Sequence, residues 1–173
     1  MFTPEEIEFL AGNELVPIVP LIRLDDLPLL TGPISLKPQQ ISTVPLWLAL
    51  ALRKARHCRL IPPPFLTIKN LGQVLHQEAL EKDGFVSADL LPQHWYELAM
   101  LYFKEAAEDI HEAEELRRLV QALREIRWGK VAAGLKDVDG TPLNLTGLGI
   151  MELNVVAKPF LVPAMNHLVK LRQ

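Results

Sequence analysis

Residues 44–64 decide the fold of this chain, and they read VPLWLALALRKARHCRLIPPP. The first part, residues 46–52, is apolar on every side, which is the pattern of a buried helix. Basic residues follow it and complement the carbonyl end of that helix. A strand at 58–61 then meets three prolines at 62–64, which can continue neither element. We therefore expect a helix buried along its whole surface, Trp47 included, and a domain boundary at the prolines.

The residues before this boundary mix short strands with short helices. Thr3-Pro4-Glu5-Glu6 predicts a helix start, with a capping box formed by the Thr and the second Glu. Residues 15–22 have a strand composition, but Pro17 and Pro20 cannot donate hydrogen bonds. We therefore expect this strand at a sheet edge or a bulge. One or two further short strands, broken by a Gly-Pro pair, are expected at 27–37. The helix that follows them should have the proline of the Val-Pro-Leu-Trp segment in its first turn.

The residues after the boundary are predicted to be helical. One helix is capped by Thr67, and its apolar face is expected to consist of Leu71, Val74, Leu75 and Ala79. A second helix has Pro92 in its first turn, and its apolar stripe is expected to consist of Trp95, Leu98, Tyr102 and Ala106. The last helix opens near Pro159. The three-residue spacing of Asp109 and Glu112 predicts a capping box at the start of a long helix. The apolar stripe of that helix has the helical period and consists of Leu116, Leu119, Val120, Leu123 and Ile126.

The predicted fold class is α+β: a small N-terminal β-rich domain with two short helices at 1–61, followed by a larger all-α helical domain at 62–173. Of the 173 residues, 49% are hydrophobic, and the mean hydropathy is +0.15. No apolar run approaches the ~18–20 residues that cross a bilayer, and acidic residues near the start argue against a signal peptide. We therefore expect the surplus apolar surface to be buried inside the chain or against other protein chains.

The ionisable residues form no recognisable catalytic or metal-binding pattern. His111-Glu112 resembles the start of a zinc-protease motif, but position 115 is Glu where the second His is required. Gly147 and Gly149 lack the third glycine and the Lys-Ser/Thr pair of a phosphate-binding loop. The single Cys58 allows no internal disulfide and fits a reducing compartment. We therefore expect no enzymatic activity, no metal and no cofactor.

The basic stretch from Arg53 to Arg59 allows an alternative function, a nucleic-acid-binding module. It lacks interleaved aromatic residues that would stack on bases. The formal net charge of −3 also disfavours a dedicated DNA-binding domain. A second charge pattern, acidic at 105–115 and basic at 117–130, fits either complementation of a helix dipole or a bipolar surface for partner subunits. Both interpretations of that pattern stay open.

A series of short segments runs along almost the whole chain in a fixed order. They are Glu8-Phe9-Leu10-Ala11, Val44-Pro45-Leu46-Trp47-Leu48-Ala49, Cys58-Arg59-Leu60-Ile61-Pro62-Pro63, Tyr96-Glu97-Leu98, Leu116-Arg117, Leu119-Val120, Met151-Glu152-Leu153-Asn154 and Ala164-Met165-Asn166-His167-Leu168. In order and spacing they resemble the Psf-two-type subunits of the eukaryotic GINS replication complex. Several separate segments at matching intervals are far more specific than any single motif.

This resemblance implies a function that the residues alone do not. It implies a non-catalytic scaffold subunit in the nucleus, assembled with the other three GINS subunits into a heterotetramer. The tetramer would join the MCM ring and a Cdc-forty-five-type protein in the CMG replicative helicase, which initiates and extends chromosomal DNA replication. No membrane and no small-molecule substrate is expected, and DNA contact is at most indirect or weak. The interface or core candidates are Val44, Pro45, Leu46, Trp47, Arg59, Leu116, Arg117, Leu119, Val120, Leu123, Met151, Asn154, Asn166 and Leu168.

Overall fold

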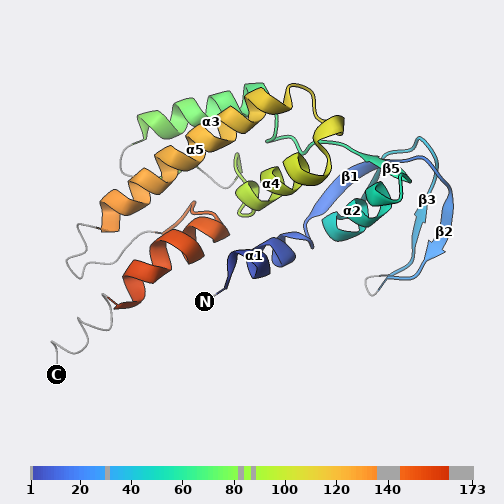
Figure 1. Cartoon of the computed structure of the whole chain (residues 1–173), viewed down its shortest axis with the longest axis horizontal. Helices are drawn as coiled ribbons and strands as arrows, with labels where there is room; N and C mark the ends of the chain where they lie inside the picture. Colours follow the sequence, from blue (N-terminus) through green and yellow to red (C-terminus); the bar gives the residue numbers. More distant parts are fainter. Residues whose placement is uncertain (1, 30–31, 82–83, 87–88, 136–144, 164–173) are drawn as a thin grey trace.

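The structure is a computed structural model that describes residues 2–29, 32–81, 84–86, 89–135 and 145–163 (Figure 1). Figure 1 shows the strands gathered at one end of the molecule, the long helices toward the other, and the N-terminal helix between them. The predicted α+β class is confirmed. Within the described ranges, no helix combines the length and apolar character needed to cross a membrane.

The elements follow one another as strands and short helices first, then longer helices. In chain order they are α1 (Pro4–Ala11), β1 (Leu15–Pro20), β2 (Leu24–Leu27), β3 (Ile34–Leu36), β4 (Ser42–Pro45), α2 (Leu46–Lys54), β5 (Cys58–Leu60), α3 (Ile68–Leu80), α4 (Trp95–Glu105), the 3-10 turn η1 (Ala107–Asp109), α5 (Ala113–Gly134) and the π-helical segment η3 (Glu152–Ala157).

Two predicted helix caps are present. At α1 the Glu6 amide donates to Thr3 Oγ1 at 3.2 Å, and the Thr3 amide donates to the Glu6 carboxylate at 2.8 Å. At α3 the Asn70 amide donates to Thr67 Oγ1 at 3.3 Å. Each cap satisfies an amide that the helix itself leaves without a partner. The local sequence therefore fixes where both helices begin.

The predicted capping box of α5 is wrong. Glu112 occupies the N-cap position in the left-handed conformation, with φ of 56°, and its side chain makes no cap hydrogen bond. The Asp109 carboxylate points elsewhere, since it accepts hydrogen bonds from Arg53 and from the Leu60 amide. A tertiary contact with a charged side chain has therefore displaced the local cap.

The helix α2 is buried on one side only, so the expectation that it is buried all round is wrong. The Trp47 side chain is 47% exposed. The helix has no side-chain cap; instead the Leu46 amide donates to the Glu14 carbonyl at 2.8 Å, and the Trp47 amide donates to the Gly12 carbonyl at 3.0 Å. The buried residues of α2 are Leu46, Leu48, Ala49 and Leu52.

The strand β1 lies in the middle of a three-stranded antiparallel sheet with the order β4-β1-β5. The expectation that its prolines place it at an edge or a bulge is therefore wrong. The register pairs Ile18 with Leu60, so Pro17 lies opposite Ile61. The Ile61 amide donates to the Pro17 carbonyl at 3.1 Å, and Pro17 has no amide hydrogen to return. The Tyr102 hydroxyl donates to the Ile61 carbonyl instead, at 3.0 Å.

The strand β4 was not predicted from the sequence. Ser42–Pro45 pairs with β1 from Ile18 to Leu15, so Pro45 ends a strand and is the N-cap of α2 rather than part of its first turn. The strands predicted at 27–37 correspond to the separate β2–β3 hairpin, although β2 begins three residues earlier, at Leu24. Gly32 lies in the break between them with φ of 121°, a conformation that suits glycine.

The last described helix is continuous from residue 150 to residue 163, so the expected helix start near Pro159 is wrong. The π-helical turn η3 ends at Ala157, two residues before this proline. A proline inside an α-helix removes a donor and crowds the carbonyl four residues earlier. The wider π-helical turn relieves that crowding, which lets the helix continue through Pro159.

One continuous core includes side chains from both halves of the chain. It runs from Val16 and Val44 in the sheet, through Leu66, to Tyr102 and Leu123 in the helices. The predicted apolar stripe of α4 is confirmed, because Trp95, Leu98, Tyr102 and Ala106 are all buried. The proposed domain boundary at residues 62–64 stays a prediction.

We predict that Tyr102→Phe destabilises the chain, because the Ile61 carbonyl then loses its donor. Burial raises the pKa of Tyr102, so its hydroxyl keeps its proton. The hydrogen bond is part-buried, so its loss should cost about 0.5–1.5 kcal/mol. Urea denaturation of the dilute full-length chain, followed by tryptophan fluorescence, measures the loss. Tyr96→Phe is the control, and equal losses in both variants would contradict the role assigned to the Tyr102 hydroxyl.

Candidate functional site

The residues expected at an interface or in the core differ widely in exposure. Buried are Val44, Leu46, Leu116, Val120, Leu123 and Asn154. Half-buried are Pro45, Leu119 and Met151. Exposed are Trp47, Arg59 and Arg117. Asn166 and Leu168 lie outside the described residues.

Arg117 connects α5 to α4 although much of its side chain is exposed. Its Nη2 donates to the Phe103 carbonyl at 3.0 Å, and its guanidinium lies 5.2 Å from the Phe103 ring centroid. A weaker ion pair, 3.8 Å long, joins it to Glu114 one turn earlier. Arg117 therefore has a structural contact of its own, whatever else binds its exposed side.

The basic stretch from Arg53 to Arg59 is partly neutralised inside the chain. Arg53 Nε lies 2.8 Å from the Asp109 carboxylate, and its Nη2 lies 3.5 Å from Glu108. Lys54 Nζ lies 3.6 Å from Glu105. These contacts join α2 to the end of α4 and to η1. Two of the cations that could have contacted phosphate groups are thus already paired with carboxylates.

A buried ion cluster holds three helices together at the other end of the molecule. Arg127 on α5 is fully buried. Its Nε and Nη2 donate to the two oxygens of Glu152, at 2.6 and 2.8 Å, and its Nη1 donates to Glu78 at 3.0 Å. Lys130 donates to the second oxygen of Glu78 at 2.9 Å. We call these four residues, Arg127, Lys130, Glu78 and Glu152, the ion cluster.

Each member of the ion cluster also contacts the backbone or a ring. The Arg127 Nη2 donates to the Gly147 carbonyl at 2.6 Å, and the Gly149 amide donates to Glu152 at 2.6 Å. The guanidinium lies 4.9 Å from the Phe85 ring centroid. Burial alone would lower the pKa of Arg127, but hydrogen bonds and charges from Glu152 and Glu78 outweigh it and raise the pKa. The arginine therefore stays charged.

A third buried acid, Glu97 on α4, lacks such partners. Its side chain is 1% exposed, and neither carboxylate oxygen makes a hydrogen bond. The His94 Nδ1 lies 3.5 Å from Glu97 Oε1. Burial raises the pKa of Glu97, and the charge of Glu152 adds to this effect, whereas His94 opposes it. Glu97 is thus the least satisfied ionisable group described in this core.

Large apolar side chains are exposed on several elements. They include Phe2, Phe9, Leu15, Leu21, Ile41, Trp47, Leu80, Met100, Phe160 and Val162. Single exposed apolar residues are normal, but a group that lines a hollow indicates a binding surface. Exposed apolar residues line two hollows in the described part of the chain that we consider in turn.

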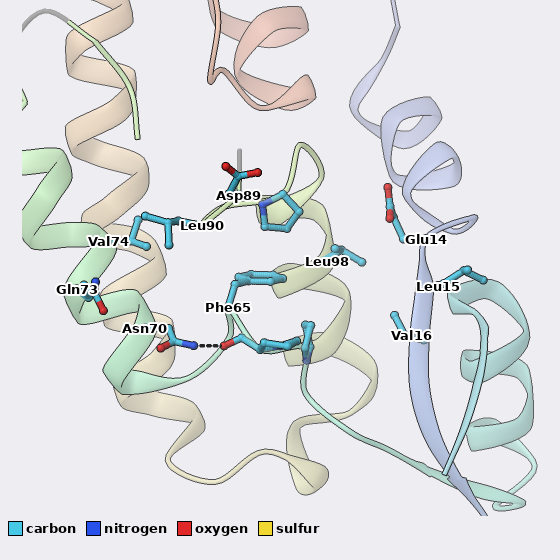
Figure 2. A pocket seen from close by; sticks show the side chains of 13 residues that line it. Glu14, Leu15, Val16, Phe65, Asn70, Gln73, Val74, Asp89, Leu90 and Leu98 are labelled. Carbon is cyan, nitrogen blue, oxygen red and sulfur yellow. Dashed lines mark hydrogen bonds between the residues drawn. The ribbon is translucent and has the colours of Figure 1, made fainter. Parts of the chain in front are cut away.

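The first hollow, of about 480 Å³, lies where α1, α2 and α4 meet. We call it the acidic groove, and it is lined by Glu5, Glu8, Phe9, Gly12, Asn13, Trp47, Leu50 and Leu101. The second, of about 400 Å³, lies between the start of β1 and α3 (Figure 2). Figure 2 shows the Phe65 ring in the middle of this second hollow, with Leu15 and Val16 on one side and Val74 on the other.

Among the described residues, no group of three or more His, Cys, Asp or Glu side chains is arranged to hold a metal ion. The buried polar residues were missed by the sequence analysis, because charged residues were assumed to face solvent or partners. One signal was available. Glu78 follows Leu71 by seven residues and Val74 by four, so it falls on the buried face of α3. Ala79, expected on that face, is exposed.

Comparisons with known proteins match the chain along almost its whole length. Residues 3–61 match the PSF2 N-terminal domain, and residues 65–168 match the GINS complex protein helical bundle domain. The chain is 39% identical to the DNA replication complex GINS protein psf2 of Schizosaccharomyces pombe, over 99% of this chain and 92% of the relative.

This chain belongs to the PSF2 family of GINS proteins. It is also 36% identical to the Candida albicans GINS protein PSF2, over 98% of this chain and 81% of the relative. It is 33% identical to the Saccharomyces cerevisiae protein of the same name, over 96% of this chain and 85% of the relative. The resemblance seen in the sequence is confirmed.

For this PSF2-family chain, we predict that Arg127→Met lowers the free energy of unfolding by about 3–5 kcal/mol. Removing one partner leaves Glu78 and Glu152 buried without their main cation. Urea denaturation of the dilute full-length chain measures the effect. Arg118→Met is the matched control on the same helix, because Arg118 is exposed. A similar small loss in both variants would show that the ion cluster does not hold the helices together.

The raised pKa of Glu97 predicts a pH-dependent stability. Because the folded-state pKa lies above the ordinary value of 4.5, the folded chain binds the Glu97 proton more tightly than the unfolded chain does. The favourable contribution is complete below about pH 4.5 and is lost as the pH rises through the raised pKa.

Glu97→Gln should therefore raise the urea midpoint at neutral pH, and the gain should shrink as the pH falls toward 4.5. Glu97 is faced by His94 and Glu152, so both are left unchanged in this variant. Glu125→Gln, on the exposed face of α5, is the control and should show no such trend. A gain that does not vary with pH would contradict the assignment.

Proposed function

We propose that this chain is a non-catalytic scaffold subunit of a heterotetrameric GINS complex. The observation that carries the proposal is the match to both GINS domains, which together span residues 3–168 with a short gap. Relatives of similar length are named as DNA replication complex proteins. The chain would accordingly act in chromosomal DNA replication, through assembly with the other three GINS subunits.

We further propose a place for that tetramer. It would join the MCM ring and a Cdc-forty-five-type protein in the CMG replicative helicase, in the nucleus, where it supports initiation and elongation. The ATP chemistry would then belong to the motor ring and not to this chain. This part of the proposal rests on membership in the family alone.

The surface of the chain supports an assembly role. Aromatic and large aliphatic side chains are exposed on α1, on α2 and on the last helix, including Phe9, Trp47 and Phe160. Exposed aromatic residues in hollows are typical of protein–protein interfaces. Among the residues singled out from the sequence, we propose Trp47, Arg59 and Arg117 as interface residues. We also propose that residues 1–61 and 62–173 form two domains that share one core.

The nucleic-acid alternative has no observation in its favour beyond the basic sequence of residues 53–59. Arg53 and Lys54 are paired with carboxylates of the same chain. A net charge of −3 would also repel phosphate groups. We therefore retain a protein-binding function as the conclusion.

Light scattering coupled to size-exclusion chromatography tests the proposed function. The chain is run alone and after co-expression with the other three GINS subunits of the same organism. We expect a stable particle with one copy of each subunit, and a lone chain that self-associates at high concentration. A lone chain that is a monodisperse monomer and does not bind the other three subunits would refute the proposal. Salt-sensitive binding of the lone chain to duplex DNA would favour the nucleic-acid alternative.

A further inference from the structure

The acidic groove has the chemistry of a binding site for one kind of partner. We propose that it binds a segment of another protein chain that carries an apolar anchor residue and a nearby Lys or Arg. The anchor would enter the hollow between Phe9 and Trp47, and the cation would meet Glu5 and Glu8 at the rim. The inference rests on the proposed function, since it assumes that the chain works inside an assembly.

The apolar floor of the groove is held rigidly. Trp47 is the second residue of α2, and its amide donates to the Gly12 carbonyl at 3.0 Å. A Cβ at position 12 would lie 2.9 Å from the Phe9 carbonyl oxygen, so a side chain there would crowd the end of α1 itself. It would lie 3.6 Å from the Trp47 Cβ, which is ordinary van der Waals contact. The hydrogen bond from the Trp47 amide therefore holds the start of α2 against the end of α1, and the backbone that carries the Trp47 ring is already ordered before a partner binds.

Two aromatic rings in the groove remain uncovered. Phe9 is 79% exposed and Trp47 is 47% exposed, while Leu50 and Leu101 are half-buried beside them. A volume of about 480 Å³ accommodates one or two large side chains. Tryptophan is among the residues that dominate binding energy when a partner covers them. The hollow therefore suits an apolar anchor.

The rim of the groove is acidic and lacks an internal counterion. No Lys, Arg or His lines it, and neither Glu5 nor Glu8 forms an ion pair within the described part of the chain. Glu5 lies in the first turn of α1, where a negative charge interacts favourably with the positive end of the helix dipole. Glu8 lies in the last turn, where a negative charge interacts unfavourably with the helix dipole. A Lys or Arg side chain of a partner would offset this unfavourable interaction by pairing with the Glu8 carboxylate.

The same charges select the class of partner. Two carboxylates beside the hollow repel the phosphates of nucleic acids and the headgroups of anionic lipids. Opposite charges at the rim of an interface raise the association rate and fix the orientation of the bound segment. The groove therefore fits a basic, apolar protein segment, which distinguishes it from the partly neutralised basic stretch at the C-terminal end of α2.

Photo-crosslinking inside cells tests the occupant directly. Benzoylphenylalanine replaces Phe9 in one variant and Trp47 in another, with the exposed position of Arg118 on α5 as the control. We expect both groove positions to crosslink to one and the same segment of another protein chain. Sequencing of the adduct should show an apolar residue within about one helical turn of a Lys or Arg. An adduct within the same chain, an adduct with nucleic acid, a segment without a basic residue, or no adduct would each overturn the proposal.

Charge reversal tests the role of the rim. Glu5→Lys combined with Glu8→Lys should lower the yield of the Trp47 adduct by about tenfold, since two attractive rim charges become repulsive. Glu81→Lys combined with Glu125→Lys, at exposed positions after α3 and on α5, makes the same change in net charge away from the groove. It should leave the yield unchanged. Equal yields in the two double variants would overturn the proposal.

The outcome separates the groove from the proposed function. Assembly of each double variant with the three GINS subunits is measured by the same chromatography, which also shows whether the variant folds. If the unmodified chain assembles but the groove positions form no specific adduct, only the groove proposal fails. If the unmodified chain does not assemble at all, the proposed function fails, whatever the groove binds.

Discussion

The arrangement of the helices depends on one buried charge. The Arg127 guanidinium is enclosed by the chain, and a buried cation is tolerated only when carboxylates and carbonyls surround it. Its carboxylate partners, Glu78 and Glu152, come from α3 and from the last helix, so α5 cannot slide against either without exposing a charge to an apolar core. An apolar stripe permits small shifts in register, whereas three donors aimed at fixed oxygens do not. The ion cluster therefore sets which turns of the three helices meet.

A different constraint acts where the sheet meets the helices. The central strand contains prolines, so the sheet cannot satisfy its own hydrogen bonds. Residues of the helical part supply partners: the Tyr102 hydroxyl donates to the Ile61 carbonyl, to which Pro17 cannot donate, and the Asp109 carboxylate accepts from the Leu60 amide, which points away from β1 at the sheet edge. Both contacts join the strand end before the prolines at 62–64 to the helices after them. The sheet is therefore completed by the second half of the chain, which is consistent with one core shared by both halves.

The sequence was informative where structure depends on nearby residues. The caps at Thr3 and Thr67 and the apolar stripe of α4 follow from side chains within a few positions of one another, and all three were predicted. The errors have a different origin. The position of β1 in the sheet depends on a hydroxyl far away in the sequence, from Tyr102. The lost cap at Asp109 depends on Arg53. Neither partner is visible in a local pattern.

Burial of polar residues was harder still to predict. Glu97 and Arg127 are charged residues, which usually face solvent. Only the folded structure shows that both are buried. The candidate groove was missed for a related reason. The apolar stretch at 46–52 indicates burial, but a sequence pattern cannot tell whether the cover comes from the same chain or from another.

Trp47 shows why this distinction matters for function. The backbone that carries this half-exposed ring is already ordered, so covering the ring later requires no further ordering of the backbone. The same ring, buried inside the chain, would add to stability but could not contribute to binding. The fold encloses Arg127, Glu78 and Glu152 and leaves Trp47 and Phe9 uncovered, beside two carboxylates without an ion pair in the described part of the chain. In a chain whose family is named for a complex, this uncovered apolar surface with defined charge is consistent with the partner segment that we propose.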